Sequence, residues 1–173
     1  MTTESSAPLV FITGASSGIG QALGQRYAQA GWRLALVARR ATELTEWTQA
    51  QGWGPERCQV YRADVSVLDE IIGAAQACLA RQGVPEVVVA NAGISIGMDT
   101  AVRADIDVMA RTFATNNVGL AATFHPFVQP MRQRGPGRER RLLGLGLGFS
   151  AAAAASVVLA LRPAPIDPQH LFE

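Results

Sequence analysis

The sequence predicts an α/β fold, a doubly wound parallel sheet, on two observations. Short apolar runs alternate four times with longer segments in which apolar residues recur at helical spacing. The fourth run, Glu86–Ala90, is apolar almost throughout, which is typical of a parallel strand covered by helices on both faces.

Turn and cap residues set the limits of the predicted elements. Gly31 ends the first helix, and Gly83 with Pro85 ends the third. Ser66 lies three residues before an acidic residue, a spacing that predicts a capping box at the start of the third helix. Pro126 should kink or restart the fourth helix. The expected strands are residues 9–13, 33–38, 59–62 and 86–90, and the expected helices are residues 18–30, 42–51, about 68–79 and about 105–131.

Composition narrows the class of protein. The length of 173 residues predicts one domain, and a hydrophobic content of 49% is enough for a core. A net charge of +1 gives no reason to expect nucleic acid as a partner. The segment Met1–Pro8 lacks the pattern of a signal peptide, and Cys58 and Cys78 are expected to be reduced, so we expect a cytoplasmic protein. These cysteines form no metal-type pair, and the isolated His125 and His170 are expected to be structural, so no metal site is predicted.

A glycine-rich segment, Thr13–Gly20, joins the first strand to the first helix. A strand, a glycine turn and a helix start suit the pyrophosphate of a dinucleotide, because free N–H groups and the helix dipole face the anion. Gly14 would make the tight turn, Gly18 would let a phosphate approach the backbone, and Gly20 would let the helix pack closely on the sheet. An ordinary Gly/Ser turn is the alternative. The residues predicted to bind the cofactor here are Gly14, Ser16, Ser17, Gly18, Ile19 and Gly20.

The Thr-Gly-x-x-x-Gly-x-Gly spacing of this segment resembles the cofactor motif of the short-chain dehydrogenases/reductases. Three further segments match that family in order: Asp64-Val65 after the third strand, Asn91-Ala92-Gly93 after the fourth, and Asn116 three residues before Gly119. The resemblance covers residues 9 to about 134. It implies a Rossmann-type fold and an oxidoreductase that transfers hydride between a nicotinamide cofactor and an alcohol or carbonyl substrate.

The resemblance places the adenosine half of the cofactor beside two of these segments. Asp64 would accept a hydrogen bond from the adenine amine, and the Val65 backbone would hold the ring edge. The small residues around Asn91, Ala92 and Gly93 would let the chain approach the ribose. Two alternatives stay open: Asp64 caps only the turn that follows it, and Asn91 makes only a structural contact with the sheet.

The fourth helix contributes the one catalytic residue that the resemblance identifies. In the family an Asn on this helix helps to hold a water in a proton relay. The spacing of three residues to Gly119 selects Asn116 over Asn117, whereas helical periodicity alone does not choose between them.

The end of the second strand predicts the choice of cofactor. An NAD-selective site has an acidic residue there, whereas this chain has Arg39 and Arg40. The Arg39 guanidinium can pair with the 2′-phosphate of NADP and stack on adenine, and Arg40 can assist. We therefore predict NADP in preference to NAD. The alternative is a pair of solvated arginines that cap the strand.

The chain departs from the family where the proton-transfer residues should follow. The family uses a Ser, then a Tyr, then a Lys four residues later. Here Tyr27 and Tyr61 both lie in the cofactor half, and the chain has no Lys. An alignment with a fifth strand at residues 142–147 puts Ser150 near the Ser position but leaves Pro163 and Asp167 near the other two, and neither can do that chemistry. The sequence thus divides into an NAD(P)-binding domain, residues 1–134, and an atypical tail, residues 135–173.

Three explanations of the tail are open. A coding frame or chain end altered after about Gly135 would account for the shift to Arg, Gly, Ala, Leu and Pro. A cofactor-binding protein without dehydrogenase activity is the second. A membrane-anchored variant is the third and less favoured, since residues 142–161 carry no charge but contain several glycines. Compared with the family, the sheet is expected to be truncated or altered at its C-terminal end, and an open edge on the fourth strand would favour aggregation. The family associates through the long helix and a later one; since the later helix is not recognisable here, a homo-oligomer is possible but not favoured.

Overall fold

The structure, a computed structural model, describes residues 7–134 and 157–159. Within these residues a sheet has the strand order β3-β2-β1-β4-β5, and the pairs among β1 to β4 are parallel, which confirms the predicted fold class. The strands are β1 (Leu9–Thr13), β2 (Arg33–Ala38), β3 (Cys58–Arg62), β4 (Val87–Ala90) and β5 (Val157–Leu159). The helices are α1 (Gly18–Gln29), α2 (Ala41–Ala50), α3 (Leu68–Gln82), α4 (Arg103–Phe113), the π-helical turn η1 (Ala114–Val118) and α5 (Gly119–Gln133).

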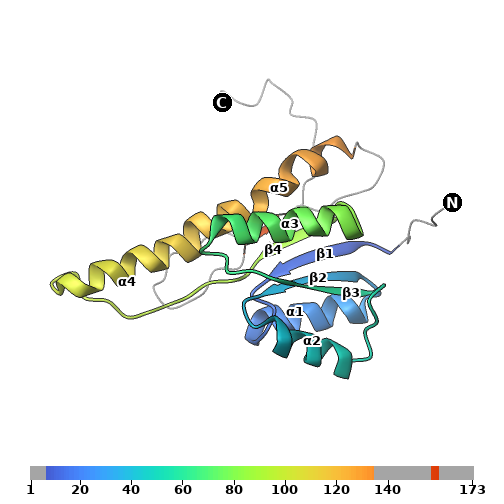
Figure 1. Cartoon of the computed structure of the whole chain (residues 1–173), viewed down its shortest axis with the longest axis horizontal. Coiled ribbons are helices and arrows are strands. Elements are labelled where there is room, and N and C mark those ends of the chain that lie inside the picture. The colour runs from blue at the N-terminus through green and yellow to red at the C-terminus, as the bar shows by residue number, and fades with distance from the viewer. Residues whose placement is uncertain (1–6, 135–156, 160–173) are drawn as a thin grey trace, which may run out of the picture.

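Helices cover both faces of the sheet, with α1 and α2 on one side and α3 and α5 on the other (Figure 1). All five residues of β1 are buried, and the first four alternate between two hydrophobic clusters. Leu9 and Phe11 belong to the α3 and α5 side, where the Phe11 ring lies 4.7 Å from that of Phe127. Val10 and Ile12 belong to the α1 and α2 side. Burial on both faces explains why this strand is a continuous apolar run.

The predicted capping box at α3 is wrong. The helix begins at Leu68, and its N-terminal flanking residue, Val67, makes no side-chain cap. The Ser66 hydroxyl instead donates to Asp64 Oδ1 at 2.7 Å, and the Ser66 N–H donates to the same atom at 2.9 Å. Because a nearer carboxylate takes the hydroxyl, it is not available to the first helical turn.

The fourth predicted helix is present, but its irregularity lies away from Pro126. α5 runs without a break through Pro126 and Pro130, so the expected restart at Pro126 does not occur. Phe127 and Met131 of the same segment are buried in the core, and this packing holds the helix despite the lost backbone hydrogen bonds. The departure from α-helical geometry is instead the π-helical turn η1, eight residues before Pro126.

The β4 edge is covered in part, contrary to expectation. β5 pairs antiparallel with β4, Leu159 opposite Val88 and Val157 opposite Ala90. An antiparallel neighbour satisfies edge N–H and C=O groups without the crossover helix that a parallel one needs. The strand expected at 142–147 lies outside the described residues, as do Ser150, Pro163, Asp167 and most of the uncharged run. No helix in the described ranges has the length and hydropathy to span a membrane.

Candidate functional site

A cleft of about 840 Å³ opens at the carboxyl ends of the parallel strands. Eleven of the fourteen residues predicted for the site line it, whereas Gly18, Gly20 and Asn116 do not. The predicted residues in the lining are Gly14, Ser16, Ser17, Ile19, Arg39, Arg40, Asp64, Val65, Asn91, Ala92 and Gly93. The lining residues that sequence reasoning missed are Val37, Ala38, Ala63, Ser66, Ile94, Ile96, Arg111, Ala114 and Thr115.

Three glycines shape the loop between β1 and α1 in different ways. A Cβ on Gly14, which has φ +66°, would lie 2.8 Å from the Ala92 Cα. A Cβ on Gly20 would lie 2.2 Å from the Gly14 carbonyl oxygen, so this glycine lets the first turn of α1 touch the loop. Gly18, with φ +56°, has open space where a Cβ would be. Two glycines thus permit close backbone packing, and the third leaves room for a ligand at a helix N-terminus.

The Asn91 side chain holds the start of this loop. Its Nδ2 donates to the carbonyl oxygens of Thr13 and Gly14 at 3.1 and 3.2 Å, and the backbone N–H of Asn91 donates to Thr13 Oγ1 at 3.1 Å. The Ala92 N–H donates to the same hydroxyl at 3.1 Å. These bonds join the ends of β1 and β4, so the structural contact left open from the sequence is present.

Arg40 lies against the glycine-rich loop. Its guanidinium donates to Ser16 Oγ at 3.3 Å and to Ser17 Oγ at 3.5 Å, and its Nε lies 3.2 Å from the Glu43 carboxylate. Hydroxyl donors and a guanidinium are groups that bind phosphate oxygens. Glu43, in the first turn of α2, is a carboxylate near this position that the sequence-based interpretation did not consider.

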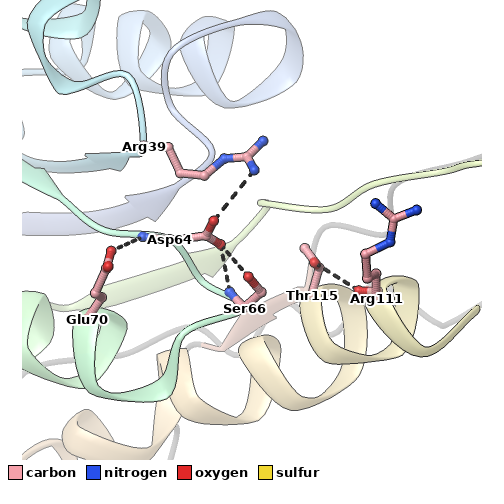
Figure 2. Close-up of polar contacts among 6 residues, drawn as sticks. All are labelled: Arg39, Asp64, Ser66, Glu70, Arg111 and Thr115. Atoms are coloured by element: carbon pink, nitrogen blue, oxygen red, sulfur yellow. Dashed lines mark hydrogen bonds and ion pairs between the residues drawn. The ribbon is translucent and has the colours of Figure 1, made fainter. Parts of the chain in front are cut away.

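Arg39 and Asp64 face each other across the mouth of the cleft (Figure 2), with 3.5 Å between Arg39 Nη1 and Asp64 Oδ2. The Arg39 side chain is 69% exposed. Partial burial raises the pKa of Asp64, but the two hydrogen bonds from Ser66 and the charge of Arg39 outweigh it and hold that pKa below its ordinary value. The carboxylate is therefore ionised at neutral pH, and it also shapes the turn before α3, as the alternative reading of Asp64 expected.

Asn116 holds the chain that follows β4. Its Oδ1 accepts from the Ile94 N–H at 2.9 Å, and its Nδ2 donates to the Ile94 carbonyl at 2.8 Å. Asn117 is exposed, so the three-residue spacing selected the Asn that faces inward. A Cβ on Gly119 would lie 2.3 Å from the Val65 carbonyl oxygen, so this glycine lets α5 pack on the segment that follows β3.

The helix side of the cleft is formed by Arg111, Ala114 and Thr115. Thr115 Oγ1 donates to the Arg111 carbonyl at 3.1 Å, one turn back along the helix (Figure 2). Arg111 and Thr115 are four residues apart and share a face of the helix, but no motif in the sequence identifies that face as a wall of the cleft.

The sequence profile described as short chain dehydrogenase matches residues 8–138. The chain is 33% identical over 135 residues to sulfoacetaldehyde reductase 2 of Chromohalobacter salexigens, covering 75% of this chain and 51% of that protein. It is 26% identical to the NADP-dependent 3-hydroxy acid dehydrogenase YdfG of Shigella flexneri, covering 75% and 51%. An alcohol dehydrogenase from the archaeon Thermococcus sibiricus, solved with 5-hydroxy-NADP, is 29% identical with a TM-score of 0.65, covering 73% of this chain and 54% of that one.

This chain belongs to the short chain dehydrogenase family, and it spans about half the length of the curated relatives it matches.

Proposed function

We propose that the chain binds NADP(H) and forms the cofactor half of an oxidoreductase acting on an alcohol or carbonyl compound. One observation carries the proposal: the Arg40 guanidinium, bonded to the Ser16 and Ser17 hydroxyls, lines the same cleft as these serines, and the loop that carries them leaves open space at Gly18. This arrangement fits a dinucleotide phosphate, because the backbone is accessible and the side chains are donors.

The residues present would hold the adenosine end of the cofactor. Arg39 and Arg40 would pair with the 2′-phosphate, and Asp64 with Val65 would meet the adenine edge. Two relatives support the preference for NADP, since one is NADP-dependent by name and another was solved with an NADP derivative. An NAD-selective site has a carboxylate that binds the ribose hydroxyls. Here the Glu43 and Asp64 carboxylates each pair with an arginine, so neither is a free acceptor for those hydroxyls.

When bound, the nicotinamide supplies or accepts the hydride, and the protein must move the accompanying proton. Neither tyrosine of the chain reaches the cleft. The Tyr61 hydroxyl donates to Gln82 Oε1 at 3.0 Å, and burial raises its pKa, while Tyr27 packs against Trp32. Asn116 would help to hold a water of the proton relay, and its amide bonds to the Ile94 N–H and carbonyl also position the backbone there.

The absence of a suitable tyrosine in the described residues favours a second candidate, a protein that binds NADP(H) without turnover.

We also propose the division between a cofactor domain, residues 1–134, and a tail, residues 135–173. Reading the other coding frames after Gly135 tests it: a Ser followed by Tyr-x-x-x-Lys would identify an altered frame.

Titration of the chain with NADPH and NADH, followed through nicotinamide fluorescence, tests the proposal. We expect NADPH to bind more tightly by about tenfold or more, the effect of one charge-assisted phosphate contact. Tighter binding of NADH would refute the NADP assignment. NADPH oxidation with a panel of aldehydes and ketones would exclude the candidate without turnover, whereas binding alone would favour it.

A further inference from the structure

A third arginine, Arg111, lines the cleft on the side opposite β2. The charged residues in the lining are Arg39, Arg40, Asp64 and Arg111. Arg39 is paired with Asp64, and Arg40 with Glu43. Within residues 7–134 and 157–159, Arg111 has no carboxylate at ion-pair distance. Of the three arginines in the cleft lining, Arg111 is therefore the one whose charge no carboxylate offsets.

The local structure of α4 explains why Arg111 is left without a partner. Asp107, four residues before it, pairs with Arg103 at 3.5 Å, one turn further back. Thr115, four residues after it, contributes only a hydroxyl, which bonds to the Arg111 carbonyl. Figure 2 shows the Arg111 side chain extending upward from its helix, and the Arg39 guanidinium lying above Asp64 and Ser66 in the same view.

We propose that Arg111 is a cofactor-affinity residue that attracts the phosphate-bearing adenosine end of the ligand. The inference rests on the proposed function and adds a residue from the helix wall. A charge without a nearby carboxylate acts on a ligand anion at full strength, whereas the charges of Arg39 and Arg40 are partly offset by their partners. The contribution of Arg111 to ligand affinity should therefore increase with the number of phosphates on the ligand and decrease as the salt concentration rises.

The probe is adenosine 2′,5′-bisphosphate, which carries the two phosphates of the adenosine half of NADP, measured by calorimetry on the full chain. Arg111→Gln should weaken its binding by about tenfold at low salt, as expected for one lost charge-assisted contact. The loss should shrink to about threefold or less near 0.5 M salt because of screening. Adenosine, which has no charge, should bind the variant and the wild type equally.

Two further variants serve as controls. Arg132→Gln removes the same charge from an exposed position on α5, outside the cleft lining and without freeing a carboxylate beside Arg111, and should bind the bisphosphate like the wild type. Arg111→Lys keeps the charge and should retain most of the affinity, although Lys offers no planar fork.

The outcomes separate the two proposals. If the wild type does not bind adenosine 2′,5′-bisphosphate, the proposed cofactor site fails and this inference fails with it. If the wild type binds while Arg111→Gln and Arg132→Gln match it, only the role of Arg111 is refuted. An equal loss of adenosine affinity in Arg111→Gln would also refute that role, because packing rather than charge would then be responsible.

Discussion

The Arg39 guanidinium and the Asp64 carboxylate lie 3.5 Å apart at the ends of neighbouring strands, β2 and β3. Ser66 fixes Asp64 Oδ1 with two hydrogen bonds, which leaves Oδ2 toward Arg39. Arg39 is thereby held over the cleft, and a ligand phosphate must share or replace its carboxylate partner.

Removing the Asp64 charge should change how stability depends on pH. The pKa of this carboxyl is lowered from 3.8 in the folded chain, so its stabilising effect is complete above that value and disappears as pH falls through the lower folded pKa. Asp64→Asn should cost about 1 kcal/mol near pH 7 after allowance for solvent screening. In urea unfolding the difference from the wild type should shrink steadily as pH falls below 3.8. A difference that stays constant as the solution is acidified would show that geometry, not charge, is what the carboxylate contributes.

Removing the Arg39 charge should act on NADPH more than on NADH. Arg39→Gln should weaken NADPH binding by about tenfold or more and NADH binding by less than about threefold, because only NADPH carries the 2′-phosphate. Arg62→Gln, at the exposed end of β3 and outside the cleft lining, controls for net charge. Equal losses for both cofactors would mean that Arg39 contacts a part that they have in common.

A methyl group at Gly20 should destabilise the fold. The new Cβ would lie 2.2 Å from the Gly14 carbonyl oxygen and 2.5 Å from Asn91 Nδ2, so α1 must move away from the loop. We expect Gly20→Ala to cost about 2–4 kcal/mol, as overpacking against backbone does. Gly73→Ala is the matched control, since that helical glycine has open space around it, and it should stabilise by about 0.5–1 kcal/mol. Thermal unfolding of both variants measures the contrast, and similar melting temperatures would contradict it.

Truncating Asn116 should loosen the chain after β4. Asn116→Ala leaves the Ile94 N–H and carbonyl without their side-chain partner, at a cost of about 1–3 kcal/mol. Hydrogen exchange at the Ile94 amide should become faster than in Asn117→Ala, where the side chain is exposed. Unchanged exchange at Ile94 would show that other contacts hold this segment.

The sequence was most informative where one cause decides the structure. The bounds of β1 and β2 agree with the prediction, because burial on both faces leaves an uninterrupted apolar run. The absence of the predicted Ser66 cap could not be foreseen, because a serine hydroxyl near a helix start can bond to the helix or to a nearby carboxylate, and spacing does not rank the two. The pairing of Val157–Leu159 with β4 could not be predicted either, because many apolar triplets of the tail have the same pattern and the sequence does not single this one out.

The site was predicted less completely than the sheet. Glycine spacing identified the loop, but it did not show that Gly18 alone of the three leaves open space. Arg111 is exposed on α4 and belongs to no motif, so only the approach of that helix to the strand ends marks it. The π-helical turn is likewise a result of packing, which brings Asn116 to Ile94 and Gly119 to Val65.

The hydrogen bonds from Asn91 to Thr13 and Gly14 have a consequence for the thermodynamics of ligand binding. They fix the start of the glycine-rich loop while the chain folds, so its conformational entropy is lost at that stage. A dinucleotide then meets a preorganised loop and need not order it, and more of the interaction energy appears as affinity. An Asn91→Ala chain that still folds should therefore bind the same cofactor with a larger entropic penalty, although Asn91 itself need not touch it.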